Sequence, residues 1–292
     1  MFKKFKKNHI KYYLMILPAF IVILIVAIYP LYMSFKLSFS EYSLLSPNSP
    51  ILFEGFDNFK RMFNSSDFIN SISVTFRLTF FVLVIDLIVG CITAAVLNKK
   101  FKFNNIVKTI VLLPLLMSPI ATGLIWKLMY NYQYGIINYI VRIIGLNGLN
   151  WLGMESTALG SIVVAVCWKS IPFVALLMLA GLKSLPGNLY EAAKIDGASK
   201  FQMTRYITIP LIMPVFMIIL IIRTMDTLRI YDQVWALTAG GPGTSTEVAS
   251  LFAYKQAFEF FQIGQGAATS VLLFLITGVI SIFYLRILWR RS

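Results

Sequence analysis

Histidine and cysteine are scarce in this chain. Its 292 residues include one histidine, His9, and two cysteines, Cys91 and Cys167. A single histidine excludes an HExxH zinc site, and because His9 lies in the basic N-terminus it also removes His-based triads and most general-base catalysis. The cysteines show no CxxC or Cys/His spacing, and both lie in apolar runs, where small buried thiols are ordinary. The sequence therefore predicts no metal site, no catalytic residue and no bound cofactor.

Charge is also scarce. Charged residues make up 13% of the chain, about half the usual share of a soluble protein, whereas 58% of the residues are hydrophobic. These values predict a multi-pass membrane protein, held in a lipid bilayer. The net charge of +14 would favour nucleic acid in a soluble protein. A nucleic-acid-binding surface needs basic residues clustered on a soluble domain, which we do not expect in this chain. We therefore expect no nucleic-acid partner.

Apolar runs of about 20 residues predict six transmembrane helices. The first follows a stretch, Met1–Lys11, that holds five lysines, and it is too long for the apolar region of a signal peptide. The fold is therefore expected to be all-α, with a single transmembrane domain over residues 1–292. The predicted spans cover approximately 12–35, 72–97, 106–130, 157–182, 206–224 and 267–288.

Basic residues gather on one side of these spans. The N-terminus, Asn98–Lys108, Lys183–Arg205 and the C-terminal arginines together hold 16 of the 26 basic residues. Because lysine and arginine accumulate in cytoplasmic loops, both termini are predicted to be cytoplasmic. The same rule places the connection 185–205 in the cytoplasm.

This connection contains sequence signals for the starts and ends of helices. Asn188 precedes Glu191 by three residues, and Ser199 precedes Gln202 by three, so each pair has the form of a capping box. Gly197 stands where a residue in the left-handed region would end the first helix. We expect two short helices joined at Asp196–Gly197, and a loop built in this way favours docking.

Two charges lie within predicted spans: Asp86 in the second and Lys169 in the fourth. Charges at such a depth should pair or face water. The prediction is a structural ion pair or a shared polar cavity, and the alternative is that either residue faces a transport path alone.

The end of the fifth span is rich in polar and aromatic residues. Aromatic rings beside hydrogen-bonding groups suit a sugar, because rings stack on its CH faces and carboxylates accept from its hydroxyls. An ordinary interfacial rim is the alternative. The residues are Arg223, Asp226, Arg229, Tyr231, Asp232 and Trp235; of these Asp226, Tyr231, Asp232 and Trp235, together with Lys169, are our candidates for the substrate path.

Glycine and proline give two further signals. The stretch AGGPGTSTE lacks the lysine of a phosphate-binding loop, so an ATP-driven process would need a separate ATPase chain. Prolines can bend the later spans, as a path that changes shape requires. They are Pro114, Pro119, Pro172, Pro210 and Pro214.

The stretch from Glu191 to Pro214 resembles the EAA loop of permeases from binding-protein-dependent ABC importers. The matching residues are Glu191, Ala192, Ala193, Asp196, Gly197, Ala198, Phe201, Ile209, Pro210 and Pro214. Further stretches resemble the carbohydrate-importer branch and its maltose-permease-like first subunit: LPAF (Leu17–Phe20), Tyr29–Tyr42, GFDNF (Gly55–Phe59), DQVWALTAGGP (Asp232–Pro242) and YKQAF (Tyr254–Phe258).

The resemblance implies the fold of a type I ABC importer permease. It also implies a location in the cell (inner or plasma) membrane and four kinds of partner: a second, similar permease, two cytoplasmic ATPase subunits that bind ATP and Mg, an extracytoplasmic sugar-binding protein and a carbohydrate. In this family the EAA loop is the helix that docks on the ATPase. Glu191 would pair with a basic group there, Ala192 and Ala193 would allow close approach, and Gly197 would make the turn.

The chain departs from the larger maltose permeases, which have two additional N-terminal helices and a long extracytoplasmic domain. The sugar contacts of those proteins are therefore not transferred. The function expected is transport rather than catalysis: the permease subunit of a carbohydrate importer, with the sugar itself unidentified. The alternative is an ion-coupled secondary sugar transporter, which should show inverted repeats and several carboxylates in mid-membrane.

Overall fold

The structure, a computed structural model, describes residues 14–43, 45, 51–99 and 102–289. The five N-terminal lysines and residues 12–13 of the first predicted span lie outside them. The chain divides into two compact units. Unit 1 comprises Met1–Ser65 and Ala253–Leu272, and unit 2 comprises Ser66–Phe252 and Leu273–Ser292.

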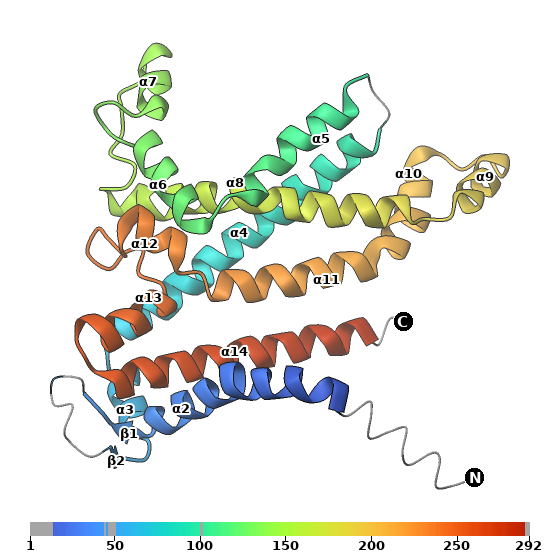
Figure 1. Ribbon diagram of the computed structural model, residues 1–292. Coiled ribbons are helices and arrows are strands. Elements are labelled where there is room, and N and C mark those ends of the chain that lie inside the picture. Colours follow the sequence, from blue (N-terminus) through green and yellow to red (C-terminus); the bar gives the residue numbers. More distant parts are fainter. Residues whose placement is uncertain (1–13, 44, 46–50, 100–101, 290–292) are drawn as a thin grey trace, which may run out of the picture. The chain divides into compact units, whose positions relative to one another are not determined.

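Long apolar helices dominate both units (Figure 1). Within the described residues, five helices are long and apolar enough to cross a membrane, and a bent pair of helices supplies a sixth candidate. Each predicted span falls on one of them, so the all-α prediction is confirmed; the sidedness of the loops stays a prediction. The five helices are Leu14–Ser38, Ser66–Asn98 (α4), Glu155–Lys183 (α8), Lys200–Leu228 (α10, η3 and α11) and Ile263–Ile287 (within α14, Ile263–Trp289).

Unit 1 holds a small hairpin beside the first span. Strands β1 (Ser40–Glu41) and β2 (Leu52–Phe53) pair antiparallel after the helix Leu14–Ser38, which contains η1 (Leu24–Ile28) and α2 (Tyr29–Ser38). Helix α3 (Asp57–Phe63) is fixed to the hairpin by Asn58, whose Nδ2 donates to the carbonyl oxygens of Ser38 (3.1 Å) and Ser40 (2.8 Å). The segment η4 (Lys255–Glu259) also belongs to this unit.

Unit 2 is built on the packing of α4 against α8. At the crossing, a Cβ on Gly90 would lie 2.5 Å from Val174 Cγ1, so only glycine permits this approach without a shift of Val174. Side chains from α4, α8, α12 (Asp232–Thr238) and α13 (Ala249–Tyr254) form the main core. Its buried members include Val74, Leu78, Val82, Ile162, Val163, Val166, Val234, Leu237 and Leu251.

The third predicted span, 106–130, is two helices rather than one. Helix α5 (Asn104–Leu112) continues into the 3-10 turn η2 (Leu113–Leu116), and α6 (Pro119–Met129) leaves it at an angle of 101°. Pro114 tightens the end of the first part, and Ser118 caps the second, accepting from the Ala121 N–H at 3.2 Å. Pro114 and Pro119 predicted a bend in this span. The 101° break also needs an extended residue between the two helices, and Ser118 supplies it.

The glycine-rich stretch after α12 is a structural loop. It starts at Ala239 and Gly240, both in the left-handed region. Thr246, fully buried, donates to the Gly241 carbonyl at 2.7 Å, and Thr75 of α4 accepts from the Ala249 N–H at 2.8 Å. The loop thereby fixes α12, whose first residues reach the site described next.

Candidate functional site

A buried ion pair joins three helices of unit 2. Asp86 on α4 is fully buried, and its Oδ2 accepts from both Nε and Nη2 of Arg223 on α11 at 2.9 Å. Ser170 on α8 donates its hydroxyl to Asp86 Oδ1 at 2.7 Å. A buried carboxylate is tolerated where charged and neutral donors surround it in this way.

The predicted pairing of Asp86 with Lys169 is wrong. Successive residues of a helix point about 100° apart, so Ser170 rather than Lys169 faces Asp86 from α8. The cationic partner comes from α11 instead. Lys169 lies on the wall of a cavity that Arg223 also lines, whereas Asp86 is not among the residues that line it.

The polar cavity has a volume of about 250 Å³ and lies between α6, α8, α11 and α12. Arg223 links it to the buried pair, because its Nη1 lies 3.5 Å from Asp226 Oδ2. Four of the five predicted substrate-path residues are on its wall. Trp235, the fifth, is not among the lining residues that the structure describes, and 43% of its surface is exposed. The walls are formed by Pro119, Val166, Lys169, Arg223, Asp226, Thr227, Arg229, Ile230, Tyr231, Asp232 and Gln233.

Gln233 is a cavity residue that the sequence reasoning missed. Only 5% of it is exposed, and among the described residues its Nε2 has no hydrogen-bond partner. A buried amide donor without a partner costs free energy, which a hydroxyl or water oxygen in the cavity would recover. Its place directly after Asp232, on the first turn of α12, was the available signal.

The connection 185–205, called the EAA loop below, contains two short helices, as predicted. Helix α9 (Gly187–Ile195) ends in a Schellman motif: Gly197 has φ +77°, and the Ala198 N–H donates to the Ala193 carbonyl at 2.8 Å. Helix α10 (Lys200–Met203) starts with the predicted capping box of Ser199 and Gln202. The other predicted box is wrong: α9 already begins at Gly187, so Asn188 lies inside its first turn.

One side-chain contact joins α9 to the next span. The Tyr190 hydroxyl lies 2.8 Å from Thr208 Oγ1, at the end of the π-helical segment η3 (Thr204–Thr208) that leads into α11 (Ile209–Leu228). Either hydroxyl can donate in this contact, and Thr208 Oγ1 also lies 3.4 Å from the Met203 carbonyl oxygen. This hydrogen bond holds α9 against the start of α11.

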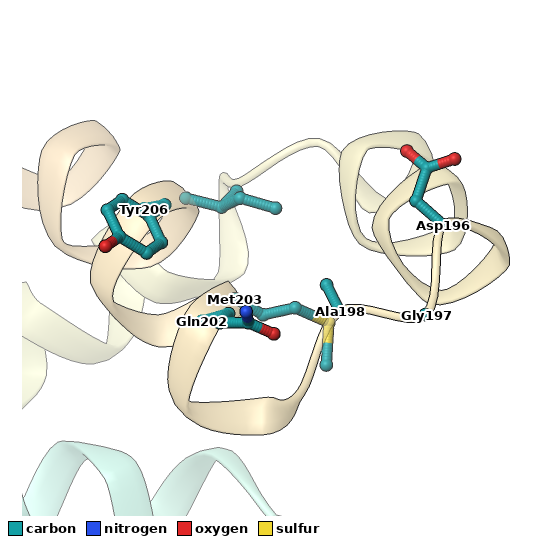
Figure 2. A pocket seen from close by; sticks show the side chains of 7 residues that line it. Asp196, Gly197, Ala198, Gln202, Met203 and Tyr206 are labelled. Atoms are coloured by element: carbon teal, nitrogen blue, oxygen red, sulfur yellow. The ribbon is translucent and has the colours of Figure 1, made fainter.

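The EAA loop exposes both charged and large apolar side chains. Glu191, Ala192 and Asp196 are exposed, as are Ile195 (87%) and Phe201 (74%). A hollow of about 310 Å³ lies between the turn and α10, with Tyr206 and Asp196 at opposite ends (Figure 2). Apolar groups left in solvent beside a hollow suit contact with another protein.

The buried pair generates a stability prediction. Arg223→Met should leave Asp86 with Ser170 alone and cost about 3–5 kcal/mol, whereas Asp86→Asn should cost less because Arg223 keeps Asp226 nearby. The double variant Asp86→Leu/Arg223→Met should recover much of the loss. Thermal unfolding in detergent measures the order.

Lys169→Met is the matched control, since Lys169 makes no ion pair with Asp86 and should leave the melting temperature nearly unchanged. If Lys169→Met were as harmful as Asp86→Asn, the assignment of Arg223 as the partner would be wrong.

Comparison with known proteins identifies the family of this chain. The family profile for the "Binding-protein-dependent transport system inner membrane component" matches residues 86–291. The trehalose/maltose transport system permease protein MalF of Thermococcus litoralis is 40% identical over 94% of this chain and 92% of its own length. The sulfoquinovosyl glycerol transport system permease protein SmoG of Agrobacterium fabrum is 32% identical over 96% of this chain and 90% of its own.

A solved structure agrees over almost the full length. A chain of a bacterial ABC transporter involved in the import of the acidic polysaccharide alginate superposes with a TM-score of 0.86 at 25% identity, covering 99% of this chain and 98% of that one. The protein described here belongs to the family of binding-protein-dependent transport system inner membrane components, which are multi-pass transport subunits and not enzymes.

Proposed function

We propose that this chain is the permease subunit of an ATP-driven importer of a carbohydrate. One observation carries the proposal: the EAA loop and the polar cavity lie at the two ends of the same helical rod. Thr208, held by Tyr190, stands at the start of α11, and Arg223, Asp226 and Thr227 near its end line the cavity. A displacement of the loop would therefore reach the cavity along a single helix.

The EAA loop suits a separate ATPase. Glu191 is exposed and available to a basic group of that partner, while Ala192 and Ala193 leave room for close approach. Ile195 and Phe201 would lose water on docking, which favours the contact. In the proposed assembly, two ATPase subunits bind ATP and Mg, and a second, similar permease completes the path.

The polar cavity suits a polyhydroxylated substrate. It combines carboxylates (Asp226, Asp232), the Tyr231 ring and the Gln233 amide, which are groups that accept from, stack on or donate to a sugar. Relatives named for trehalose/maltose and for sulfoquinovosyl glycerol support this class. The alginate transporter has been solved with a pentasaccharide-bound periplasmic protein, and we propose that an extracytoplasmic binding protein likewise delivers the sugar here.

The mechanism follows from these placements. Closure of the ATPase pair would move α9 and, through Tyr190, the start of α11. The far end of α11 is anchored by Arg223 to Asp86 on α4, so movement of the rod would change the shape of the polar cavity. An ion-coupled secondary transporter, the alternative, would transport without any partner on the EAA loop.

The proposed coupling is tested by valine at two glycines of the loop. Gly197→Val forces a side chain into the left-handed region, at about 1–2 kcal/mol, a factor of roughly 5–30 in the population of the turn. Uptake by the reconstituted importer, with its ATPase and binding protein, should fall accordingly, and substrate-stimulated ATP hydrolysis with it.

Gly187→Val is the control, because Gly187 lies in the same loop, also has nothing within 4 Å of its added Cβ and has no left-handed backbone. A second variant, Glu191→Lys, reverses the charge that faces the ATPase and should abolish uptake while the protein remains inserted. Undiminished uptake by either the Gly197 or the Glu191 variant, or uptake by this chain without an ATPase, would contradict the proposal.

The link between α9 and α11 predicts a second coupling defect. Tyr190→Phe and Thr208→Val each remove one side of the hydrogen bond, so each should lower the sugar transported per ATP hydrolysed, and the double variant should be no worse than the more affected single. The ratio of uptake to phosphate release measures this.

Thr204→Val provides the comparison, since the Thr204 hydroxyl donates only to the Lys200 carbonyl within its own helix. Additive losses in the Tyr190/Thr208 double variant would show that the two hydroxyls do not act together.

The Gln233 amide predicts a substrate effect. Gln233→Leu keeps the volume but removes the donor, so the sugar concentration for half-maximal uptake should rise by up to about tenfold, the worth of one hydrogen bond. Gln133→Leu, at an exposed loop position outside the cavity, should leave it unchanged. An unchanged half-maximal concentration in Gln233→Leu would remove this amide from the substrate path.

A further inference from the structure

Helix α7 (Ile136–Ile143) presents an apolar stripe that nothing in the described chain covers. Its members are spaced as one face of a helix, at positions i, i+3, i+4 and i+7. The exposed fractions are 48% for Ile136, 61% for Tyr139, 53% for Ile140 and 66% for Ile143. Single exposed apolar residues are normal on a protein surface, but four large ones on the same helix face form a contiguous patch that needs an explanation.

The opposite face of α7 is firmly held. Asn138 is fully buried; its Oδ1 accepts from the Leu149 N–H (3.0 Å) and from Trp151 Nε1 (2.9 Å), and its Nδ2 donates to the Leu149 carbonyl (3.0 Å). Arg142 Nη2 donates to the Tyr132 carbonyl at 2.7 Å. The stripe therefore has a fixed direction relative to the rest of unit 2.

Helix α7 belongs to the connection between two helices of the membrane-spanning set. It lies between the end of α6 at Met129 and the start of α8 at Glu155. The exposed apolar surface is continuous in sequence with that of α6, where Leu124 (48%) and Leu128 (61%) are also uncovered. Exposed apolar surface of this extent marks a contact with a membrane or with another protein.

The composition of the segment fits a lipid headgroup region. Residues 131–154 contain no aspartate or glutamate, and Arg142 is their only charge. Exposed tyrosines stand around it: Tyr132, Tyr134 and Tyr139. Tyrosine and arginine are favoured at the interface, where rings and guanidinium groups meet both acyl chains and phosphates, and no carboxylate is present to be repelled.

We propose that α7 is an interfacial helix, which lies on the bilayer with Ile136, Tyr139, Ile140 and Ile143 among the lipids. With 8 residues it extends about 12 Å, too short to cross the hydrocarbon core. It braces the connection between the bent third span and α8 against the membrane surface. The occupant of the stripe is phospholipid, not the second permease.

The test places a fluorescent probe on the stripe. Ile140→Trp is introduced into the complete importer, which is reconstituted in phospholipid bilayers with and without bromine on the acyl chains near the headgroup. Subtraction of the signal of the unsubstituted importer isolates the added tryptophan. A loss of its fluorescence in brominated lipid, together with a blue-shifted emission, is the expected result.

Asn147→Trp, at an exposed polar position of the same connection, is the control and should be quenched by aqueous iodide instead. Ile143→Trp repeats the measurement on the stripe in case one variant assembles poorly. Resistance of both stripe positions to brominated lipid and to iodide would mean that protein covers α7, and quenching by iodide alone would mean that water does. Either outcome overturns the proposal.

Discussion

The ion pair between Asp86 and Arg223 is the constraint on which the rest of unit 2 depends. A carboxylate in the middle of an apolar helix has to be met by donors, and here they come from α8 through Ser170 and from α11 through Arg223. The pair thus fixes three long helices at one depth. Arg223 also lines the polar cavity, so the pair helps to fix one wall of it, while the segment before α12 and the first turn of α12 supply another.

The same pair holds one end of α11, and the Tyr190–Thr208 contact holds the other. A helix anchored near one end and held by a hydrogen bond at the other transmits displacement instead of absorbing it. In η3 the π-helical register and the missing N–H of Pro210 interrupt the regular hydrogen bonding, and Pro214 interrupts it again within α11. The irregular part of the helix thus lies at the end beside the EAA loop, away from Arg223.

Sequence alone predicted features that depend on local chemistry. Span lengths, the left-handed turn at Gly197 and the capping box at Ser199 follow from residues a few positions apart. The partner of Asp86 could not be predicted, because it depends on which helices are neighbours and on a rotation of 100° per residue. The Gln233 amide could not be predicted for a similar reason, because its burial depends on how α12 packs against α6. Ala236 of α12 can approach α6 this closely only because residue 123 is glycine: a Cβ on Gly123 would lie 2.6 Å from the Ala236 Cβ.

The turn at Gly197 predicts how a D-amino acid would behave at this position. No atom lies within 4 Å of the place where its Cβ would be, and yet its φ of +77° disfavours every L-residue. The requirement at this position is therefore for handedness and not for smallness. A D-alanine would suit the left-handed backbone as well as glycine does and would also narrow the unfolded ensemble of the loop.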